Sequence, residues 1–145
     1  MAGEITGGKG SNVTCIPKKA GTVTEETWRT RVKDGGYLVQ FDAATTTADE
    51  VGVASMSNNG AVVYGRAIGY TGSGDDFRIT VETEGAYGYI QGSATGAFAA
   101  TDYGKRMKSN ANGKWAVDTS LTAGNVFLVG GDKANPAVAW RGQTE

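Results

Sequence analysis

Residues 77–131 read FRITVETEGAYGYIQGSATGAFAATDYGKRMKSNANGKWAVDTSLTAGNVFLVGG, a stretch in which short apolar or alternating runs are separated by glycine-rich turns. Apolar residues that alternate with polar ones are typical of β-strands, and glycine is typical of the turns between strands. The runs are Phe77–Val81, Ala86–Gln91, Lys105–Ser109, Trp115–Val117 and Asn125–Val129. The stretch therefore predicts a series of short strands joined by tight connections.

Residues 28–41 have the pattern of a β-hairpin. One side of the first strand would carry Trp28, Thr30 and Val32, and the other side would carry the basic residues Arg29, Arg31 and Lys33. Asp34-Gly35-Gly36 is a turn signal, and Tyr37–Phe41 follows as the returning strand. We therefore expect the three basic side chains to form a stripe on one strand face.

The remaining runs complete an all-β prediction. Val51–Ser55 and Ala61–Ile68 read as two strands joined across Ser57–Gly60, where Asn59-Gly60 favours a type I′ turn. Ala137–Trp140 is a last strand, which brings the total to about ten short strands with no long helix. The fold class expected is a single-domain β-barrel, β-tulip or sandwich.

The length of 145 residues fits one domain with a real core. Residues 1–12 are glycine-rich and polar, so we assign residues 1–16 to a flexible N-terminal arm and residues 17–145 to a single β domain. The sequence leaves open whether Trp28, Trp115 and Trp140 are core residues of this domain or contact residues on its surface. Cys15 stands beside Ile16 in an apolar run and is predicted to be a small buried hydrophobe.

Composition narrows the function classes. The chain has 14 basic and 15 acidic residues, so its net charge favours neither nucleic acid nor a membrane as partner. It has no histidine and a single cysteine, which removes Ser-His-Asp and Cys-His mechanisms and four-thiolate metal sites. No window approaches the ~18 apolar residues of a membrane span. We expect a protein without enzymatic activity, cofactor or metal, made in a cytoplasm.

Four surface features could carry a function. Tyr87 and Tyr89 lie on one face of a strand and are candidates for an interface or a sugar platform. Glu82 and Glu84 also share a strand face, and a carboxylate-pair hydrolase using them is the one enzyme that the residue inventory allows. The basic stripe of Arg29, Arg31 and Lys33 and the cluster Lys105–Lys108 would suit docking to an acidic protein surface, if they are not simply solvated faces.

The order of strands and turns from Tyr103 to Gly130 resembles the small decoration, or cement, proteins of tailed-bacteriophage heads. A Gly-x-x-apolar strand at Gly104–Met107, a Ser/Asn-rich turn ending in Gly113, the strand Trp115–Val117 and an Ala123-Gly124 step into Val126–Gly130 follow one another as in that group. The short Gly/Ala runs Val51–Ala54 and Gly65–Gly69 are similar to its earlier strands. The resemblance covers about residues 37–131.

The resemblance implies a compact β-barrel or β-tulip that binds the outer surface of an assembled capsid, commonly as a homotrimer, and stabilises it without catalysis. The partners would be the major capsid protein and further copies of this chain, and the location would be the virion. Expected capsid or subunit contacts are Ile5, Lys9, Val13, Ile16, Arg29, Arg31, Lys33, Tyr87 and Tyr89. The alternative is a carbohydrate-binding β-module, or a head-fibre or tail accessory protein, that stacks sugars on Tyr87, Tyr89 and a tryptophan.

Overall fold

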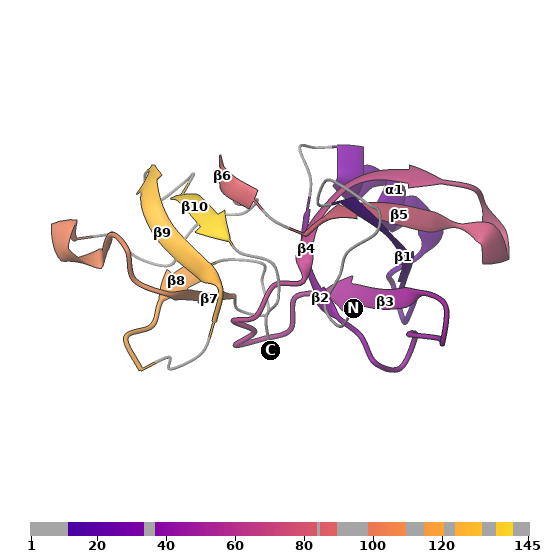
Figure 1. Cartoon of the computed structure of the whole chain (residues 1–145), viewed down its shortest axis with the longest axis horizontal. Coiled ribbons are helices and arrows are strands. Elements are labelled where there is room, and N and C mark those ends of the chain that lie inside the picture. The colour runs from indigo at the N-terminus through magenta and orange to yellow at the C-terminus, as the bar shows by residue number, and fades with distance from the viewer. Residues whose placement is uncertain are drawn as a thin grey trace, which may run out of the picture.

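The computed structural model of the chain describes residues 12–33, 37–83, 85–89, 99–109, 115–120, 124–131 and 136–140. These residues form two β-structured bodies that lie next to each other (Figure 1). We call the body formed by β1–β5 and α1 the barrel, and the body formed by β6–β10 the second lobe. The predicted all-β barrel class is confirmed, with one short helix added to it.

The barrel is a closed sheet of five strands in the order β1-β3-β2-β4-β5. Its strands are β1 (Asn12–Pro17), β2 (Tyr37–Phe41), β3 (Val51–Ser55), β4 (Gly65–Thr71) and β5 (Arg78–Glu82). β1 pairs parallel with β3 and antiparallel with β5, and this pairing closes the sheet so that no edge remains. The inward-facing side chains are those of Cys15, Val39, Val53, Ala67, Ile79 and Val81, all fully buried.

Strand β1 corrects the predicted boundary of the N-terminal arm. Residues 12–16, assigned to the arm, lie within β1, where Val13 pairs with Val81 and Cys15 pairs with both Ile79 and Val51. Residues 1–11 lie outside the described part of the chain. The alternating burial of Thr14, Cys15 and Ile16 is the period-2 pattern of a barrel strand, which a polar, glycine-rich beginning had obscured.

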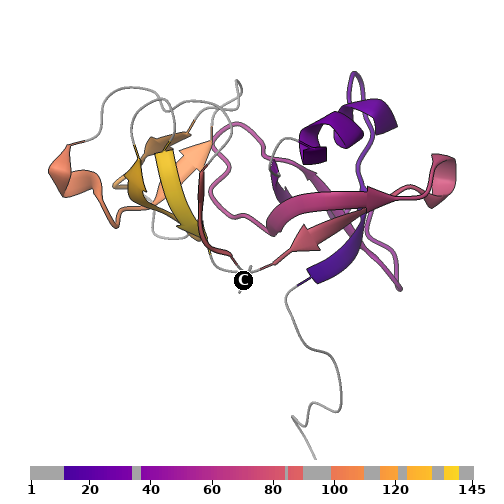
Figure 2. The same cartoon turned by 90° about the horizontal axis from the view of Figure 1, so that it is seen from above.

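The predicted hairpin over residues 28–41 is wrong in its first half, because Glu25–Lys33 is the helix α1. The backbone N–H of Thr27 donates to the Thr24 hydroxyl oxygen at 3.3 Å, so Thr24 caps the helix, and two acidic residues occupy the first turn. Trp28 and Val32 are buried while Thr30 is exposed, which is the i, i+4 spacing of a helix face and not strand alternation. α1 covers the barrel (Figure 2).

The second lobe consists of two small sheets. One has the order β6-β10-β9, from β6 (Gly85–Tyr89), β10 (Pro136–Trp140) and β9 (Val126–Gly131), and the other pairs β7 (Met107–Ser109) with β8 (Trp115–Val117). The two sheets meet where the N–H groups of Gly104 and Leu128 donate to the carbonyls of Leu128 and Lys105, at 2.6 and 3.0 Å. Their shared core contains Val63, Met107, Trp115, Val126, Leu128, Val138 and Trp140.

The connection between β3 and β4 joins the two bodies. β3 and β4 do not pair with each other, since both pair with β2, so the predicted hairpin across Ser57–Gly60 is wrong. The Gly60 N–H donates to the Ser57 carbonyl at 3.0 Å, and positive φ occurs at Asn59 (62°) but not at Gly60, so the turn is not type I′. The connection then runs through the second core, in which Val63 is fully buried.

A hydrogen-bonded clamp holds this connection on the second lobe. The Asn125 side chain accepts from the Val63 N–H at 2.7 Å and donates to the Val63 carbonyl at 2.6 Å, as a neighbouring strand would. The hydroxyl of the buried Ser109 donates to the Ser57 carbonyl at 2.7 Å. Leu38 of β2 and Met56 also pack against the second core. The predicted single β domain, residues 17–145, thus contains two cores that share one segment.

Two glycines of the barrel allow close approaches of the backbone. A Cβ at Gly52 of β3 would collide with the backbone of Thr45 and Thr46, which pass over the strand. A Cβ at Gly65, where β4 begins, would collide with the Glu82 carbonyl on β5. Glycine is required at both positions for the connection and the strand pairing to form.

The other predicted strands are confirmed with small shifts. The predictions for β2, β3 and β8 match the observed bounds, and those for β5, β6, β7, β9 and β10 overlap them. The strand predicted at Ala61–Ile68 starts later, at Gly65, because residues 61–63 turn towards the second lobe. Trp28, Trp115 and Trp140 are core residues, with 0%, 3% and 3% of their surface exposed.

Candidate interaction surface

Arg29 is committed to contacts within the barrel. Its Nη2 donates to the Glu25 carboxylate at 2.6 Å and to the Gly72 carbonyl at 3.0 Å. The guanidinium lies 4.7 Å from the ring centroid of Tyr70 and 5.3 Å from that of Phe77. The hydrogen bond from Arg29, followed by one from the Gly74 N–H, lowers the pKa of Glu25 below its usual value. Arg29 therefore holds α1 to the β4–β5 connection.

Arg31 makes a second internal set of contacts on the other side of Trp28. Its guanidinium lies 4.7 Å from the ring centroid of Tyr37 and 5.6 Å from that of Trp28, and Nη1 donates to the Ser55 hydroxyl oxygen. Residues two apart on a helix point in nearly opposite directions. Arg29 and Arg31 thus do not form the single stripe that the strand interpretation predicted.

Of the other expected contact residues, Val13 and Ile16 are half-buried in β1, and Val13 packs against the barrel core. The side chains of Lys33, Tyr87 and Tyr89 lie outside the described part of the structure, although β6 carries the two tyrosines. Ile5 and Lys9 lie outside it as well. Among the described side chains of this set, the structure places Arg29 and Arg31 on α1 and Val13 and Ile16 on β1.

Most remaining charges noted in the sequence are paired. Glu82 lies 3.4 Å from Arg66, and Glu84 is outside the described residues. In the basic cluster, Lys105 pairs with Asp102 at 3.3 Å and Lys108 pairs with Asp118 at 2.8 Å. Hydrogen bonds from Lys108 and Ser120 lower the pKa of Asp118 to about 2. The cluster is therefore largely neutralised by its own lobe.

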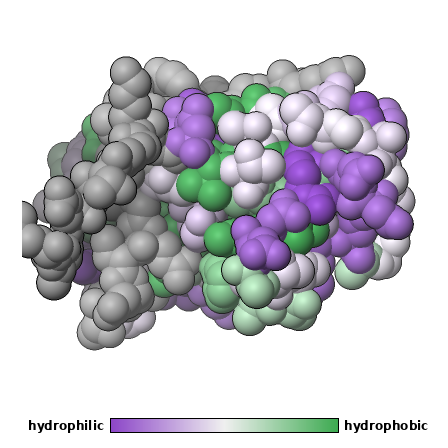
Figure 3. Space-filling view, turned by 45° about the vertical axis from the view of Figure 1, so that its right-hand side comes forward, coloured by the Kyte–Doolittle hydropathy of each residue, from purple (hydrophilic) through white to green (hydrophobic). Residues whose placement is uncertain are grey.

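Both bodies carry large apolar side chains on their surfaces, which sequence reasoning did not single out. On the barrel, Phe41 is 41% exposed and Ile68 is 37% exposed. On the second lobe, Tyr103 is 48% exposed and Val129 is 42% exposed. On the face shown in Figure 3, hydrophilic side chains divide the hydrophobic surface into patches. Single exposed apolar residues are common, but their presence on both bodies gives each body a potential contact point.

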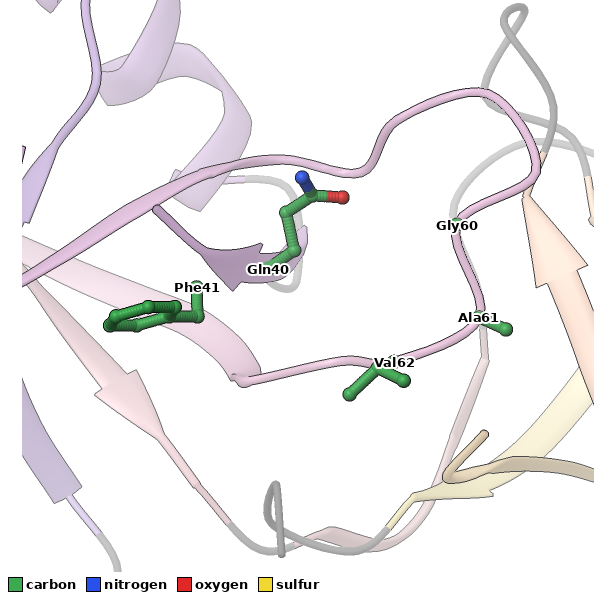
Figure 4. A pocket seen from close by; sticks show the side chains of 5 residues that line it. All are labelled: Gln40, Phe41, Gly60, Ala61 and Val62. Carbon is green, nitrogen blue, oxygen red and sulfur yellow. The ribbon is translucent and has the colours of Figure 1, made fainter. Parts of the chain in front are cut away.

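A hollow of about 290 Å³ lies beside Phe41 where β2 and the β3–β4 connection separate. It is lined by Gln40, Phe41, Gly60, Ala61 and Val62 (Figure 4). The lining is mainly apolar, and the Gln40 side chain is engaged because its Oε1 accepts from the Ser57 N–H at 2.8 Å. This hollow could not be predicted from the sequence, because the predicted hairpin over residues 51–68 does not place residues 60–62 beside Gln40 and Phe41.

Cys15 is fully buried in the barrel, as predicted, and burial raises the pKa of its thiol to about 11. A thiol with so high a pKa is almost entirely protonated at neutral pH, so its role here is packing. In the described part of the chain, His, Cys, Asp and Glu do not gather in a group of three or more that could hold a metal ion. No helix among these residues is long and apolar enough to cross a membrane.

Comparisons with known proteins give no relative. No family model matches the chain, and neither a characterised protein nor a solved structure is significantly similar to it.

Proposed function

We propose that this protein is a non-enzymatic structural component of a phage virion, which binds the outer surface of the assembled capsid and stabilises it by clamping neighbouring capsid subunits. The observation that carries this proposal is the pair of joined bodies with large exposed apolar residues on each: Phe41 and Ile68 on the barrel, Tyr103 and Val129 on the second lobe. A unit that contacts two neighbours at once is released only when both contacts fail, so modest contacts give slow release.

The way the two bodies are joined supports a clamping role. The β3–β4 connection is buried in the second core and bonded on both sides of Val63 by Asn125. The guanidinium of Arg66, on β4, lies 5.4 Å from the ring centroid of Trp140, on β10. Because these contacts fix one body against the other, a load between two capsid subunits would be carried through packed side chains.

The resemblance to decoration proteins supports the class of partner. The runs on which it rests overlap β3, β4, β7, β8 and β9, so the Gly/Ala runs Val51–Ala54 and Gly65–Gly69 belong to the strand framework. Gly52 and Gly65 are needed for close backbone approaches there. Assembly as a homotrimer on the major capsid protein is part of the same proposal, and light scattering of the purified protein measures the oligomeric state.

Binding to capsids is the direct test. Purified protein is mixed with undecorated heads of the phage that encodes the chain, and the bound fraction is measured by gradient cosedimentation and cryo-electron microscopy. We expect stoichiometric binding, and faster release for Phe41→Ser on the barrel and for Val129→Ser on the second lobe. Thr119→Ser, at an exposed position of the second lobe, is the matched control and should bind like the wild type. Protein that never sediments with heads would refute the proposal.

Charge reversal at Arg29 or Arg31 is not a useful docking test, although the predicted stripe suggested it. Both guanidinium groups hold α1 through hydrogen bonds and ring contacts, so reversal would loosen the helix before it reported on any partner. The exposed apolar residues are the better positions, because their side chains leave a large fraction of their surface free.

A further inference from the structure

Residues 57–60 of the β3–β4 connection are held on β7 by Ser109. The Asn59 N–H donates to the Ser109 carbonyl at 2.8 Å, and the Ser109 N–H donates to the Gly60 carbonyl, also at 2.8 Å. The hydroxyl of the buried Ser109 donates to the Ser57 carbonyl at 2.7 Å. We call these three hydrogen bonds the latch, because they hold the connection against the second lobe.

Asn59 is followed by glycine, which leaves its side chain open to attack by the backbone of the same chain. The Asn59 side chain is exposed. Because Gly60 has no side chain, its backbone nitrogen can approach the Asn59 side-chain carbon without steric hindrance. The other asparagines that the structure describes, Asn12, Asn58 and Asn125, are followed by valine or by another asparagine.

The local backbone explains why an asparagine-glycine pair occupies this turn. Asn59 has a φ of 62°, in the left-handed region where asparagine is favoured over most other side chains. A Cβ at Gly60 would lie 3.0 Å from the Ser57 carbonyl oxygen and 3.1 Å from Cε of Met56, closer than most side chains tolerate. The fold thus favours the two residue types that together make the pair chemically labile.

We infer that Asn59 is a site of spontaneous deamidation, and that opening of the latch controls its rate. The Gly60 nitrogen loses its proton to water and attacks Asn59 Cγ; the N–Cγ bond forms, the Cγ–Nδ2 bond breaks, and Nδ2 takes up a proton and leaves as ammonia. One water then opens the cyclic imide to aspartate or isoaspartate. In the folded chain the Gly60 N–H donates to the Ser57 carbonyl at 3.0 Å, so this bond must break before the nitrogen reacts.

The isoaspartate product is incompatible with the latch. Its main chain passes through the side-chain carbons, which adds one methylene, about 1.5 Å of chain, between Asn59 Cα and the Gly60 nitrogen. Two latch bonds, from the Asn59 N–H and to the Gly60 carbonyl, lie on either side of this insertion and share Ser109 as their partner. Both cannot keep their length, so the modified chain should release Ser109. The inference goes beyond the proposed capsid function and does not depend on it.

Peptide mass spectrometry of protein incubated at neutral pH tests the reaction. Trypsin releases residues 34–66, in which Asn58 and Asn59 are the only asparagines, and fragmentation distinguishes the two. We expect the mass gain of an amide-to-acid conversion at Asn59 and not at Asn58. Ser109→Ala removes one latch bond to a buried residue, so it should accelerate the conversion in the folded protein about tenfold, and the urea-unfolded chain should react faster still.

Ser73→Ala is the matched control for that variant, because it removes an exposed hydroxyl that makes no capping hydrogen bond. It should deaminate nothing further and convert Asn59 at the wild-type rate. Circular dichroism verifies that both serine variants are folded. The inference is overturned if Asn59 stays intact in the folded protein while the urea-unfolded chain is converted, or if folded Ser109→Ala reacts no faster than the wild type.

Hydrogen exchange tests the effect of the product on the latch. In aged protein the isoaspartyl peptide that covers residues 57–60 elutes apart from the unmodified one, so the exchange of each is measured separately. We expect the residue 59 amide of the isoaspartyl form to exchange about tenfold faster than in Asn59→Asp, which carries the same charge without the extra methylene. Asn59→Gly suits the φ of 62° and has no side-chain amide, so it should keep the wild-type protection and gain no mass at this position. Equal exchange in the isoaspartyl form and in Asn59→Asp would overturn the inference, even when Ser109→Ala fails to fold and whatever the outcome of the capsid-binding experiment.

Discussion

The barrel and the second lobe both bury tryptophan in their cores, but the indole N–H groups have different surroundings. In the barrel, Trp28 is fully buried and its Nε1 donates to the Lys18 carbonyl at 2.9 Å. In the second lobe, Trp140 is 3% exposed and its Nε1 is buried without a hydrogen-bond partner. The barrel closes on itself, whereas the lobe is built from sheets of two and three strands. The two core tryptophans therefore differ in hydrogen bonding, although the barrel also has a buried side-chain N–H group with no hydrogen-bond partner, Arg66 Nε on β4.

The difference shows that the second lobe depends on the barrel. Val63 fills the second core from the β3–β4 connection, and Leu38 and Met56 pack against the same core from barrel segments. Small sheets with open edges seldom fold alone, because they bury too little apolar surface. We therefore expect the two bodies to unfold together, with the shared segment as the physical link.

The largest effects should come from emptying either core. Ile79→Ala in the barrel and Leu128→Ala in the second lobe each remove a fully buried side chain, and each should lower the free energy of unfolding by about 2–5 kcal/mol. Because the cores share a segment, each variant should shift one common transition. Urea unfolding followed by circular dichroism and by tryptophan fluorescence measures this. Two separated transitions, of which each variant moves one, would mean that the bodies are independent.

Breaking the clamp at Asn125 should have the next largest effect. Asn125→Ala leaves the N–H and C=O of the buried Val63 without their partners, at a cost of about 2–3 kcal/mol in the free energy of unfolding. Below the pKa of its new carboxyl, Asn125→Asp keeps an acceptor for the Val63 N–H and an O–H donor for the Val63 carbonyl, so its cost should be smaller than that of the alanine variant. Above that pKa a carboxylate oxygen faces the Val63 carbonyl, and this advantage should be lost. If the two variants were equally stable, the bidentate contact would not be the link between the bodies.

Most strands could be predicted because their signals are local. Alternation over Tyr37–Phe41 and Val51–Ser55, with glycine and polar residues between, is sufficient to place β2 and β3. The helix was missed because Trp28, Thr30 and Val32 satisfy a period of two by chance. The capping residue Thr24 and the acidic pair Glu25 and Glu26 were the local signals that would have identified α1.

The candidate surface was less predictable, because it depends on contacts between distant parts of the chain. Arg29 looks free in the sequence, but its partner Gly72 is 43 residues away. The hollow forms because the Val63 backbone is hydrogen-bonded to Asn125, 62 residues later, so that the chain before Tyr64 separates from β2. No local pattern reports either pairing. Which large apolar residues remain exposed is likewise decided by the register of the sheets.

The two tryptophans allow a finer comparison of the bodies. Trp28→Phe loses the hydrogen bond to Lys18 and leaves that carbonyl without its indole partner, whereas Trp140→Phe removes a donor that has no partner. Both changes reduce aromatic area by a similar amount, so Trp28→Phe should be more destabilising than Trp140→Phe by about 1–2 kcal/mol. Urea unfolding monitored by circular dichroism provides both values. A Trp140→Phe variant that lost as much stability as Trp28→Phe would contradict the difference between the cores.

The smallest expected effect is a dependence of stability on pH that comes from the second lobe. The Asp118 carboxylate accepts from Lys108 Nζ at 2.8 Å and from the Ser120 N–H at 2.9 Å, and these contacts lower its pKa from 3.8 to about 2. A pKa that is lower in the folded state than in the unfolded state adds stability above pH 3.8, and this stability is lost as the pH falls towards 2. Asp118→Asn should therefore flatten the fall of the free energy of unfolding across this window, as measured by urea unfolding at a series of pH values.

Asp49→Asn, at an exposed position of the barrel, controls for the loss of one carboxyl group and should leave the fall as steep as in the wild type. An equally steep fall in Asp118→Asn would mean that the acid sensitivity of the fold arises elsewhere, for instance at Glu25 beside Arg29, whose pKa is also lowered.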